Sequence, residues 1–369
     1  MKRKLTTVLA FGVVCAYALT GCGSGTSATT AAPATTVGAT EAAPAAGKIA
    51  FVTGTGGLGD KSFNDLGYEG IKRLMAAGVT CDVAEPSAIA EMEGILRNFS
   101  EKGEYALIVG MGGDMVDSMV KVAADYPDQN YLVIDGSAGD VKNIRSVIIN
   151  QEDTAFLVGA YAGLMALEGN LPGADGRTSI GVVGGMDIPL IRGIQTAYEC
   201  GARYVNPGLT VQKAFVGGWS DPATGSELAT GMFENGALIV FQAAGGSGMG
   251  VLEAAQKTGL YAIGYDGNQN GIAPDNIIGS GVRGLDAEVE NASLDALAGK
   301  FVGGDISITM KDENTAAQIA LTENNIEVPQ TVLDKLEKIK AFLVEAKVAI
   351  PTEPEGIEAY LAEVGSLAD

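Results

Sequence analysis

Short apolar runs alternate with longer amphipathic stretches through most of the chain. The runs have the length of β-strands and are almost continuously apolar, as strands are when helices cover both faces of a sheet. They predict strands at residues 48–53, 79–83, 105–109, 131–134, 179–183, 209–215, 237–241 and 261–264. The amphipathic stretches predict helices at residues 64–77, 89–101, 115–125, 151–167, 190–202, 222–235, 249–258 and 332–346. This alternation predicts an α/β protein with doubly wound parallel sheets.

A weak internal sequence repeat divides the chain into two halves. Lys48-Ile-Ala-Phe-Val-Thr-Gly precedes a helix with Gly70-Ile71, and Ser179-Ile-Gly-Val-Val-Gly-Gly precedes a helix with Gly193-Ile194. Ligands of open α/β sheets bind beyond the carboxyl ends of the strands, so two such halves facing each other would enclose a cleft.

The repeat also sets the expected domain boundaries. We expect hinge crossovers between the halves near residues 145–150 and 280–283. The predicted N-terminal lobe is residues 48–150 with about 283–310, and the predicted C-terminal lobe is residues 151–282 with about 311–369.

The first residues predict export. Lys2, Arg3 and Lys4 precede an apolar run at residues 5–19, which is too short to span a bilayer and fits a signal peptide at residues 1–21. The run ends in Leu19-Thr-Gly-Cys22, which resembles a bacterial lipobox and implies lipidation of Cys22; the alternative is an ordinary signal peptide that contains a cysteine. Residues 22–47 are rich in Gly, Ser, Thr, Ala and Pro and predict a flexible tether. We therefore expect a protein outside the cytoplasm, held on the outer face of the cell membrane by a lipid alone.

The amino-acid composition argues against several kinds of ligand and catalytic site. The net charge of −21 disfavours binding to nucleic acid or to anionic lipid surfaces, which need a basic face. The chain has no histidine, which removes the commonest general base and most zinc sites, and we predict no metal site. Cys81 and Cys200 fall in different predicted lobes, which favours two buried free thiols over a disulfide.

A glycine-rich segment follows the first predicted strand. Gly54-Thr-Gly-Gly-Leu-Gly59 matches G-x-G-x-x-G, with Asp82 and Glu85 at about the spacing of a ribose-binding acid, so NAD binding is one interpretation. In a dinucleotide site the helix opens inside the glycines, whereas here Ser62 and Asp65 predict a capping box that starts the helix later. We favour a loop that lines the cleft and predict no cofactor.

Polar and aromatic residues gather where this loop meets the predicted helix. Asp60, Phe63, Asn64 and Tyr68 would suit a planar heterocycle, because an aromatic ring stacks on the base while the amide and carboxylate bind its edge. The alternative is a capped helix with Phe63 in the core.

Strand ends and loops in both predicted halves supply further candidates. Asp135 and Asp266 each follow a strand, where a carboxylate points into the crevice and can accept sugar hydroxyls, although acids here also form turns. Trp219, in a glycine-rich loop, is a second stacking wall or a loop anchor. Gly245 and Gly246 follow another strand, and their bare backbone allows close approach of a ligand.

These segments, in this order, resemble the basic membrane protein family of solute-binding lipoproteins, which includes purine nucleoside receptors of ABC transporters. The matching segments are Gly59-Asp-Lys-Ser-Phe-Asn64, Tyr68-Glu-Gly70, Val133-Ile-Asp-Gly136, Gln151-Glu-Asp-Thr-Ala-Phe-Leu-Val-Gly159, Gly217-Gly-Trp-Ser-Asp-Pro222, Phe241-Gln-Ala-Ala-Gly-Gly-Ser-Gly248 and Gly264-Tyr-Asp-Gly-Asn-Gln269. The resemblance implies a type I periplasmic-binding fold of two Rossmann-like lobes. It implies that Asn64, Phe63 and Trp219 hold the base, with Tyr68 and Asp60 nearby, and that Asp135 and Asp266 bind ribose beside Gly245 and Gly246.

The expected function is that of an extracytoplasmic receptor, not an enzyme, which binds a nucleoside and delivers it to an ABC permease. Two alternatives remain at this point. One is an exported nucleoside-processing enzyme that uses clustered aspartates. The other is a receptor or sensor of the same fold for a sugar or an autoinducer.

Overall fold

A computed structural model describes residues 47–312 and 318–367. The predicted signal peptide, Cys22 and nearly all of the predicted tether lie outside the described residues. Within these ranges, no helix combines the length and the apolar character that crossing a bilayer requires.

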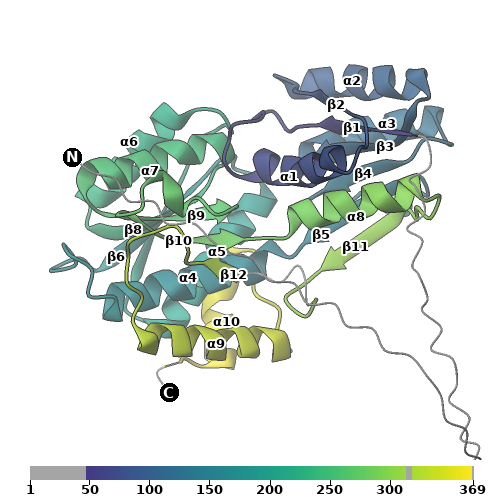
Figure 1. Cartoon of the computed structure of the whole chain (residues 1–369). Helices are drawn as coiled ribbons and strands as arrows, with labels where there is room; N and C mark the ends of the chain where they lie inside the picture. The colour runs from purple at the N-terminus through teal and green to yellow at the C-terminus, as the bar shows by residue number, and fades with distance from the viewer. Residues whose placement is uncertain (1–46, 313–317, 368–369) are drawn as a thin grey trace, which may run out of the picture. The chain divides into compact units, whose positions relative to one another are not determined.

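Six strands of the described chain form the first sheet, and all of them are parallel. In spatial order they are β11 (Gly304–Ile308), β5 (Ile144–Ile149), β4 (Tyr131–Ile134), β3 (Tyr105–Met111), β1 (Lys48–Val52) and β2 (Cys81–Ala84). One face carries α1 (Phe63–Ala76) and α8 (Leu285–Leu297), which lie side by side, and the other carries α2 (Ile89–Lys102) and α3 (Val116–Asp125) (Figure 1). We call this unit the N-terminal lobe.

The apolar strands of this lobe contribute side chains to two hydrophobic cores, one on each face of the sheet. Successive side chains of a strand point to opposite faces. Ile49 and Phe51 therefore pack beneath α1 and α8, whereas Ala50 and Val52 pack beneath α2 and α3. This double burial explains why the strands are continuously apolar in the sequence.

The second sheet, in the C-terminal lobe, repeats the arrangement. Its order is β12 (Gln318–Ala320), β10 (Ile277–Val282), β9 (Tyr261–Asp266), β8 (Ala237–Ala243), β6 (Ser179–Gly184) and β7 (Thr210–Phe215), with only β12 antiparallel among these described strands. Helices α4 (Gln151–Glu168) and α5 (Pro189–Val205) pack together on one face, and α6 (Pro222–Glu234) and α7 (Gly248–Thr258) pack on the other. Outside α4 and α5 lie α9 (Gln330–Glu345) and α10 (Ile357–Val364) (Figure 1).

The two sheets match position by position, which explains the internal repeat of the sequence. The strands β1 and β6 hold the same place in the two orders, as do β3 and β8, and β4 and β9. The chain passes between the lobes where β5 ends and α4 begins, where β10 ends and α8 begins, and between β11 and β12. At the first crossing Asn150 caps α4, because its Oδ1 accepts hydrogen bonds from the amides of Glu152 (3.0 Å) and Asp153 (3.3 Å).

Some strands begin or end at other residues than the sequence pattern predicted. Residues 79 and 80, predicted as strand, precede β2, because the Val79 amide donates to the Leu74 carbonyl (3.0 Å) and still closes the end of α1. The strands β3, β8 and β9 run further than predicted, to Met111, Ala243 and Asp266. These additional residues carry the chain to the edge where both lobes meet.

The two cysteines that the structure describes are free thiols in different lobes, as predicted. Cys200 is buried, but Cys81 is only half-buried, because β2 is the edge strand of its sheet. Burial raises the pKa of Cys200 to about 12 and that of Cys81 to about 11, so both thiols remain protonated at neutral pH.

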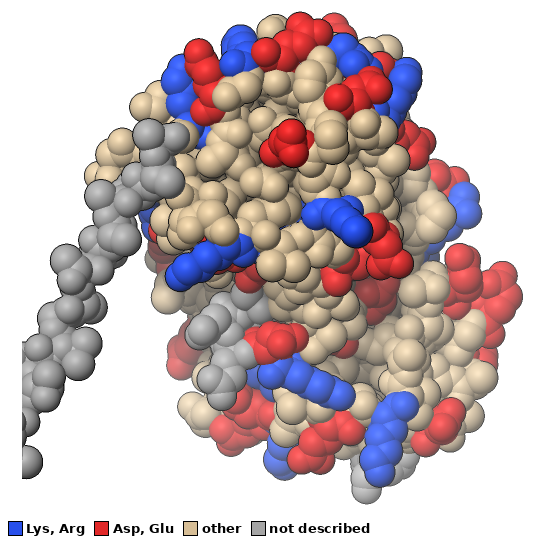
Figure 2. All heavy atoms as spheres, turned by 90° about the vertical axis from the view of Figure 1, so that its right-hand side faces the viewer, with Lys and Arg blue, Asp and Glu red and all other residues tan. Residues whose placement is uncertain are grey.

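The acidic composition is visible at the surface. On the face drawn in Figure 2, Asp and Glu side chains are interspersed with Lys and Arg, and the basic side chains form no continuous patch there. Many of the basic side chains are in ion pairs, such as Lys48 with Glu104 (2.8 Å) and Arg97 with Asp125 (2.9 Å).

Candidate ligand-binding site

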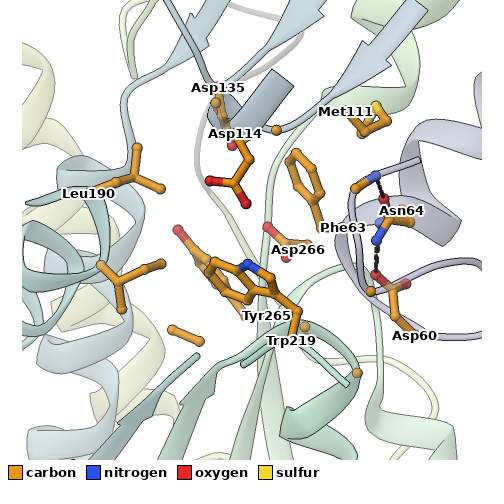
Figure 3. A pocket seen from close by; sticks show the side chains of 18 of the residues that line it. Asp60, Phe63, Asn64, Met111, Asp114, Asp135, Leu190, Trp219, Tyr265 and Asp266 are labelled. Carbon is orange, nitrogen blue, oxygen red and sulfur yellow. Dashed lines mark hydrogen bonds between the residues drawn. The ribbon is translucent and has the colours of Figure 1, made fainter. Parts of the chain in front are cut away.

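A cavity opens where the carboxyl ends of the strands of the two lobes face each other (Figure 3). It holds about 870 Å³ of empty space, a value that includes open solvent at its mouth. Its wall is formed by Gly54, Thr55, Gly56, Asp60, Phe63, Asn64, Met111, Gly112, Gly113, Asp114, Asp135, Gln151, Ile188, Leu190, Ile191, Ile194, Trp219, Ala243, Gly245, Gly246, Tyr265, Asp266 and Arg283.

Asp60, not Ser62, caps helix α1. Its carboxylate accepts hydrogen bonds from the amides of Ser62 (2.9 Å), Asn64 (2.9 Å) and Asp65 (3.1 Å). The predicted capping box is therefore wrong: the Ser62 side chain makes no cap, and the Asp65 carboxylate turns back to the amides of Gly59 (2.7 Å) and Lys61 (3.0 Å). Burial raises the pKa of Asp60, although these hydrogen bonds oppose the rise.

This cap decides what the glycine loop can do. In a dinucleotide site, free amides at the helix N-terminus bind the pyrophosphate. Here the Asp60 carboxylate occupies that place, and α1 begins only at Phe63, after the glycines. The loop is therefore unsuited to a dinucleotide, and within the described ranges no His, Cys, Asp and Glu cluster is arranged to hold a metal ion.

Asn64 is fixed at the cavity wall by two hydrogen bonds. Its Oδ1 accepts from the Gly54 amide (2.8 Å), and its Nδ2 donates to Asp60 Oδ2 (2.9 Å), as the dashed lines in Figure 3 show. One hydrogen of Nδ2 is left for another acceptor. Phe63, the preceding residue, is half-buried and presents its ring to the cavity.

The structure does not bring Tyr68 to the cavity. Its ring packs on Phe51 (centroids 5.8 Å apart), and the Lys72 ammonium lies over it (5.4 Å). Tyr68 lies one helical turn beyond Asn64, about 5.4 Å further from the edge of the sheet. The prediction that Tyr68 is a site residue is therefore not supported by its position.

Arg283 joins the two predicted ribose-binding acids. Its Nη1 donates to Asp135 Oδ2 (2.8 Å), while Nε (2.9 Å) and Nη2 (2.5 Å) donate to Asp266 Oδ1. All three side chains are at least nine-tenths buried. The two acids hold equivalent places, after β4 and at the end of β9, and both have left-handed backbones (φ +58° and +66°). Arg283 lies at the second crossover, so this cluster links one lobe to the other.

Three buried polar atoms on the cavity wall have no hydrogen-bond partner among the described residues: Asp135 Oδ1, Gln151 Nε2 and the Tyr265 hydroxyl. Leaving a buried polar atom unpaired costs about 1–3 kcal/mol, so such atoms in a cavity indicate a place for a ligand. Burial raises the pKa of Asp135, and the charge of Arg283 opposes this rise.

Trp219 lies on the cavity wall, and Ser247 holds its loop in place. The Ser247 amide donates to the Trp219 carbonyl (2.9 Å), and its Oγ donates to the Gly218 carbonyl (2.8 Å) and accepts from the Asp221 amide (2.9 Å). Gly245 and Gly246 lie against this loop: a Cβ at Gly246 would stand 3.0 Å from the Trp219 carbonyl oxygen. These glycines allow the tryptophan loop to sit close to η2 (Gly245–Ser247).

The two lobes also contact each other directly beside the cavity. Ser62 Oγ lies 2.7 Å from Asp266 Oδ2 and 3.1 Å from the Tyr265 carbonyl oxygen. A Cβ at Gly56 would stand 3.5 Å from the Trp219 Cβ. The loops that the sequence placed in separate halves thus meet in one site.

Sequence reasoning missed several residues of this site: Met111, Asp114, Gln151, Tyr265 and Arg283. A signal was present for Asp114, because Gly112-Gly-Asp114 follows a strand just as Gly245 and Gly246 do. Arg283 was placed at a crossover, but nothing in the sequence showed that it would bind both acids.

Comparison with known proteins supports the resemblance seen in the sequence. Residues 48–349 match the Bmp family, described as "ABC transporter substrate-binding protein PnrA-like". The nucleoside-binding protein BmpA of an ABC transporter of Lactococcus lactis is 24% identical, over 96% of this chain and 100% of that protein. An uncharacterized lipoprotein of Pyrococcus abyssi is 30% identical, over 72% of this chain and 67% of that protein.

A solved structure gives the fold. The solute-binding protein of an ABC transporter system from Aeropyrum pernix is 26% identical and superimposes with a TM-score of 0.76, over 86% of this chain and 97% of that one. This similarity confirms the predicted type I periplasmic-binding fold. The chain belongs to the Bmp family of ABC transporter substrate-binding proteins.

Proposed function

We propose that the chain binds a purine nucleoside in the cavity between its lobes, does no chemistry on it, and delivers it to an ABC permease. The observation that carries this proposal is the group of unpaired polar atoms, Asp135 Oδ1, Gln151 Nε2 and Tyr265 OH, in a cavity with aromatic rings from both lobes. Sugar hydroxyls can pair with the polar atoms while a base packs on the rings.

The ribose would lie beside the arginine cluster. Asp135 Oδ1 is free to accept a hydroxyl, and Gln151 Nε2 can donate to one. Asp266 already accepts hydrogen bonds on both oxygens, from Arg283 and from Ser62, so its main part is to orient Arg283 and to join the lobes. Asp135 is therefore the stronger acceptor for the ligand.

The base would lie between Phe63 and Trp219. Stacking of a base on an aromatic side chain contributes about 1–3 kcal/mol. The free hydrogen of Asn64 Nδ2 can donate to a ring nitrogen or a carbonyl of the base. Ile188, Leu190 and Ile191 supply an apolar wall that suits the faces and edges of a purine.

Contacts between the lobes support the delivery step. A ligand that touches both lobes favours the arrangement in which they meet, and this hinge-type closure gives a permease a surface to recognise. We propose further that Cys22 carries a lipid that holds the protein at the outer face of the membrane.

Calorimetry tests the proposal. The chain from residue 23 onward is unfolded and refolded to remove any carried-over ligand, and is then titrated with nucleosides, free bases and monosaccharides. We expect submicromolar binding of a purine nucleoside, and recovery of the nucleoside intact after long incubation. Binding of a monosaccharide in preference to every nucleoside would refute the ligand assignment, and release of free base would indicate an enzyme.

A further inference from the structure

The loops after β3 and β8 hold equivalent places in the two sheets but differ in their side chains. The strand β3 leads into η1 (Gly113–Met115), and β8 leads into η2, so Asp114 corresponds to Gly246. At Gly246 a Cβ would be crowded, because it would stand 3.0 Å from the Trp219 carbonyl oxygen. At the matching place in the N-terminal lobe the chain carries a carboxylate.

The Asp114 carboxylate projects into the cavity and has no hydrogen-bond or ion-pair partner among the described residues (Figure 3). Its loop borders the ring of Phe63, since a Cβ at Gly112 would stand 3.8 Å from Phe63 Cε1. Asp114 therefore lies beside the aromatic ring on which the base is proposed to stack.

Protein cations do not neutralise Asp114. Arg283 is the one basic residue on the described cavity wall, and its hydrogen bonds go to Asp135 and Asp266. The wall also carries Asp60, which is occupied by the cap of α1. A carboxylate accepts hydrogen bonds and donates none when ionised, so Asp114 can accept hydrogen bonds from N–H or O–H donors of a ligand in the cavity.

We propose that Asp114 determines base specificity by accepting hydrogen bonds from a ring N–H and an adjacent exocyclic amino group, and so selects 2-amino-6-oxopurine nucleosides. This inference rests on the proposed function. Guanine presents both donors on one edge. The distance between its ring N–H and its amino group matches the distance between the two oxygens of a carboxylate.

Other purines fit this carboxylate less well. Hypoxanthine keeps the ring N–H but lacks the amino group, so it offers one donor. Adenine presents a ring nitrogen with a lone pair at the same position, which the carboxylate repels. The expected order of affinity is therefore guanosine, then inosine, then adenosine.

Two variants with the same change of charge test the proposal. Asp114→Asn alters the cavity, whereas Asp117→Asn alters an exposed carboxylate in the first turn of α3 that does not line it. Calorimetric titration of the refolded chain from residue 23 onward with guanosine, inosine and adenosine gives the affinities. We expect D114N to weaken guanosine at least tenfold and to leave adenosine unchanged or tighter, because an amide can donate to the adenine ring nitrogen. We expect D117N to match the unmodified chain.

The outcomes separate the two proposals. If the unmodified chain binds no nucleoside, the proposed function fails and this inference fails with it. If it binds nucleosides but D114N weakens all three equally, or changes none, then only the role of Asp114 is overturned. A preference for adenosine in the unmodified chain would also overturn it.

Discussion

The two lobes share one strand order but bury their helices differently. In the N-terminal lobe, each face of the sheet has its own core, and the outer sides of the helices are exposed. In the C-terminal lobe, α9 and α10 lie over α4 and α5, residues 154–165 of α4 are all buried, and the core is continuous. The comparison indicates that the C-terminal lobe is the more firmly packed platform.

The same contrast appears in the cavity. The C-terminal lobe contributes a tryptophan loop that Ser247 holds and a glycine loop that packs against it. Side chains with free hydrogen-bonding capacity come from both lobes: Asn64, Asp114 and Asp135 from the N-terminal lobe, and Gln151 and Tyr265 from the C-terminal lobe. We infer that the C-terminal lobe fixes the shape of the site through these two loops, whereas both lobes supply polar groups for the ligand.

The largest effect is expected where the lobes are joined. Arg283→Met leaves Asp135 and Asp266 buried without a cation, which should lower the free energy of unfolding by about 3–5 kcal/mol and abolish ligand binding. Urea unfolding at pH 7 measures the loss. Arg145→Met is the control: Arg145 pairs within the N-terminal lobe with Asp295, which is partly exposed, so we expect a loss of about 1–2 kcal/mol.

The pH dependence of Arg283→Met gives a second measurement. Burial raises the pKa of Asp135, and Arg283 lowers it, so removing the arginine should raise this pKa further. A carboxyl whose pKa is raised by folding stabilises the fold below its unfolded pKa, and this contribution is lost as the pH rises through the folded value. The loss of unfolding free energy caused by R283M should therefore be smaller at pH 5 than at pH 7. Equal losses for R283M and R145M at both pH values would contradict the bridging role.

The next largest effect should come from a glycine-to-alanine substitution in a helix of each lobe, because the helices of the two lobes pack differently. In the C-terminal lobe α4 and α5 cross in close contact, and a Cβ at Gly159 would stand 1.9 Å from the Tyr198 carbonyl oxygen. Gly159→Ala should destabilise the protein by about 3 kcal/mol, because backbone must move. Gly94→Ala, in the open middle of α2, meets nothing within 4 Å and should stabilise by up to about 1 kcal/mol. Thermal unfolding of the two variants checks both signs; a neutral G159A would show that the crossing can relax.

The sequence was sufficient for the fold because most strands are covered on both faces. Buried strands such as β4 read as unbroken apolar runs, and the repeat between β1 and β6 revealed two lobes. Strand ends also pointed to Asp135 and Asp266, since the carboxyl edge of a parallel sheet is where ligands bind.

The partners of these residues could not be predicted, because they depend on how the lobes meet. Arg283 is far from Asp135 in sequence, and no local pattern pairs them. Asp60 and Ser62 both stand where a cap could form, and only the path of the loop decided for Asp60. Tyr68 shares a helix face with Asn64, but its distance along the helix takes it out of the cavity.

The smallest effects should distinguish a hydroxyl that joins the lobes from one that works within a single lobe. Ser62→Ala removes a hydrogen bond to Asp266 in the other lobe, so it should weaken nucleoside affinity about tenfold, or about 1.4 kcal/mol, with little change in the melting temperature of the unliganded chain. Ser247→Ala removes two hydrogen bonds that hold the Trp219 loop within the C-terminal lobe, so it should lower unfolding free energy by about 1–2 kcal/mol even without ligand. Calorimetric titration and thermal unfolding of both variants give the four values. If S62A lowers the stability of the unliganded chain as much as S247A does, then the contact between Ser62 and Asp266 is a permanent part of the fold rather than a contribution to ligand-linked closure.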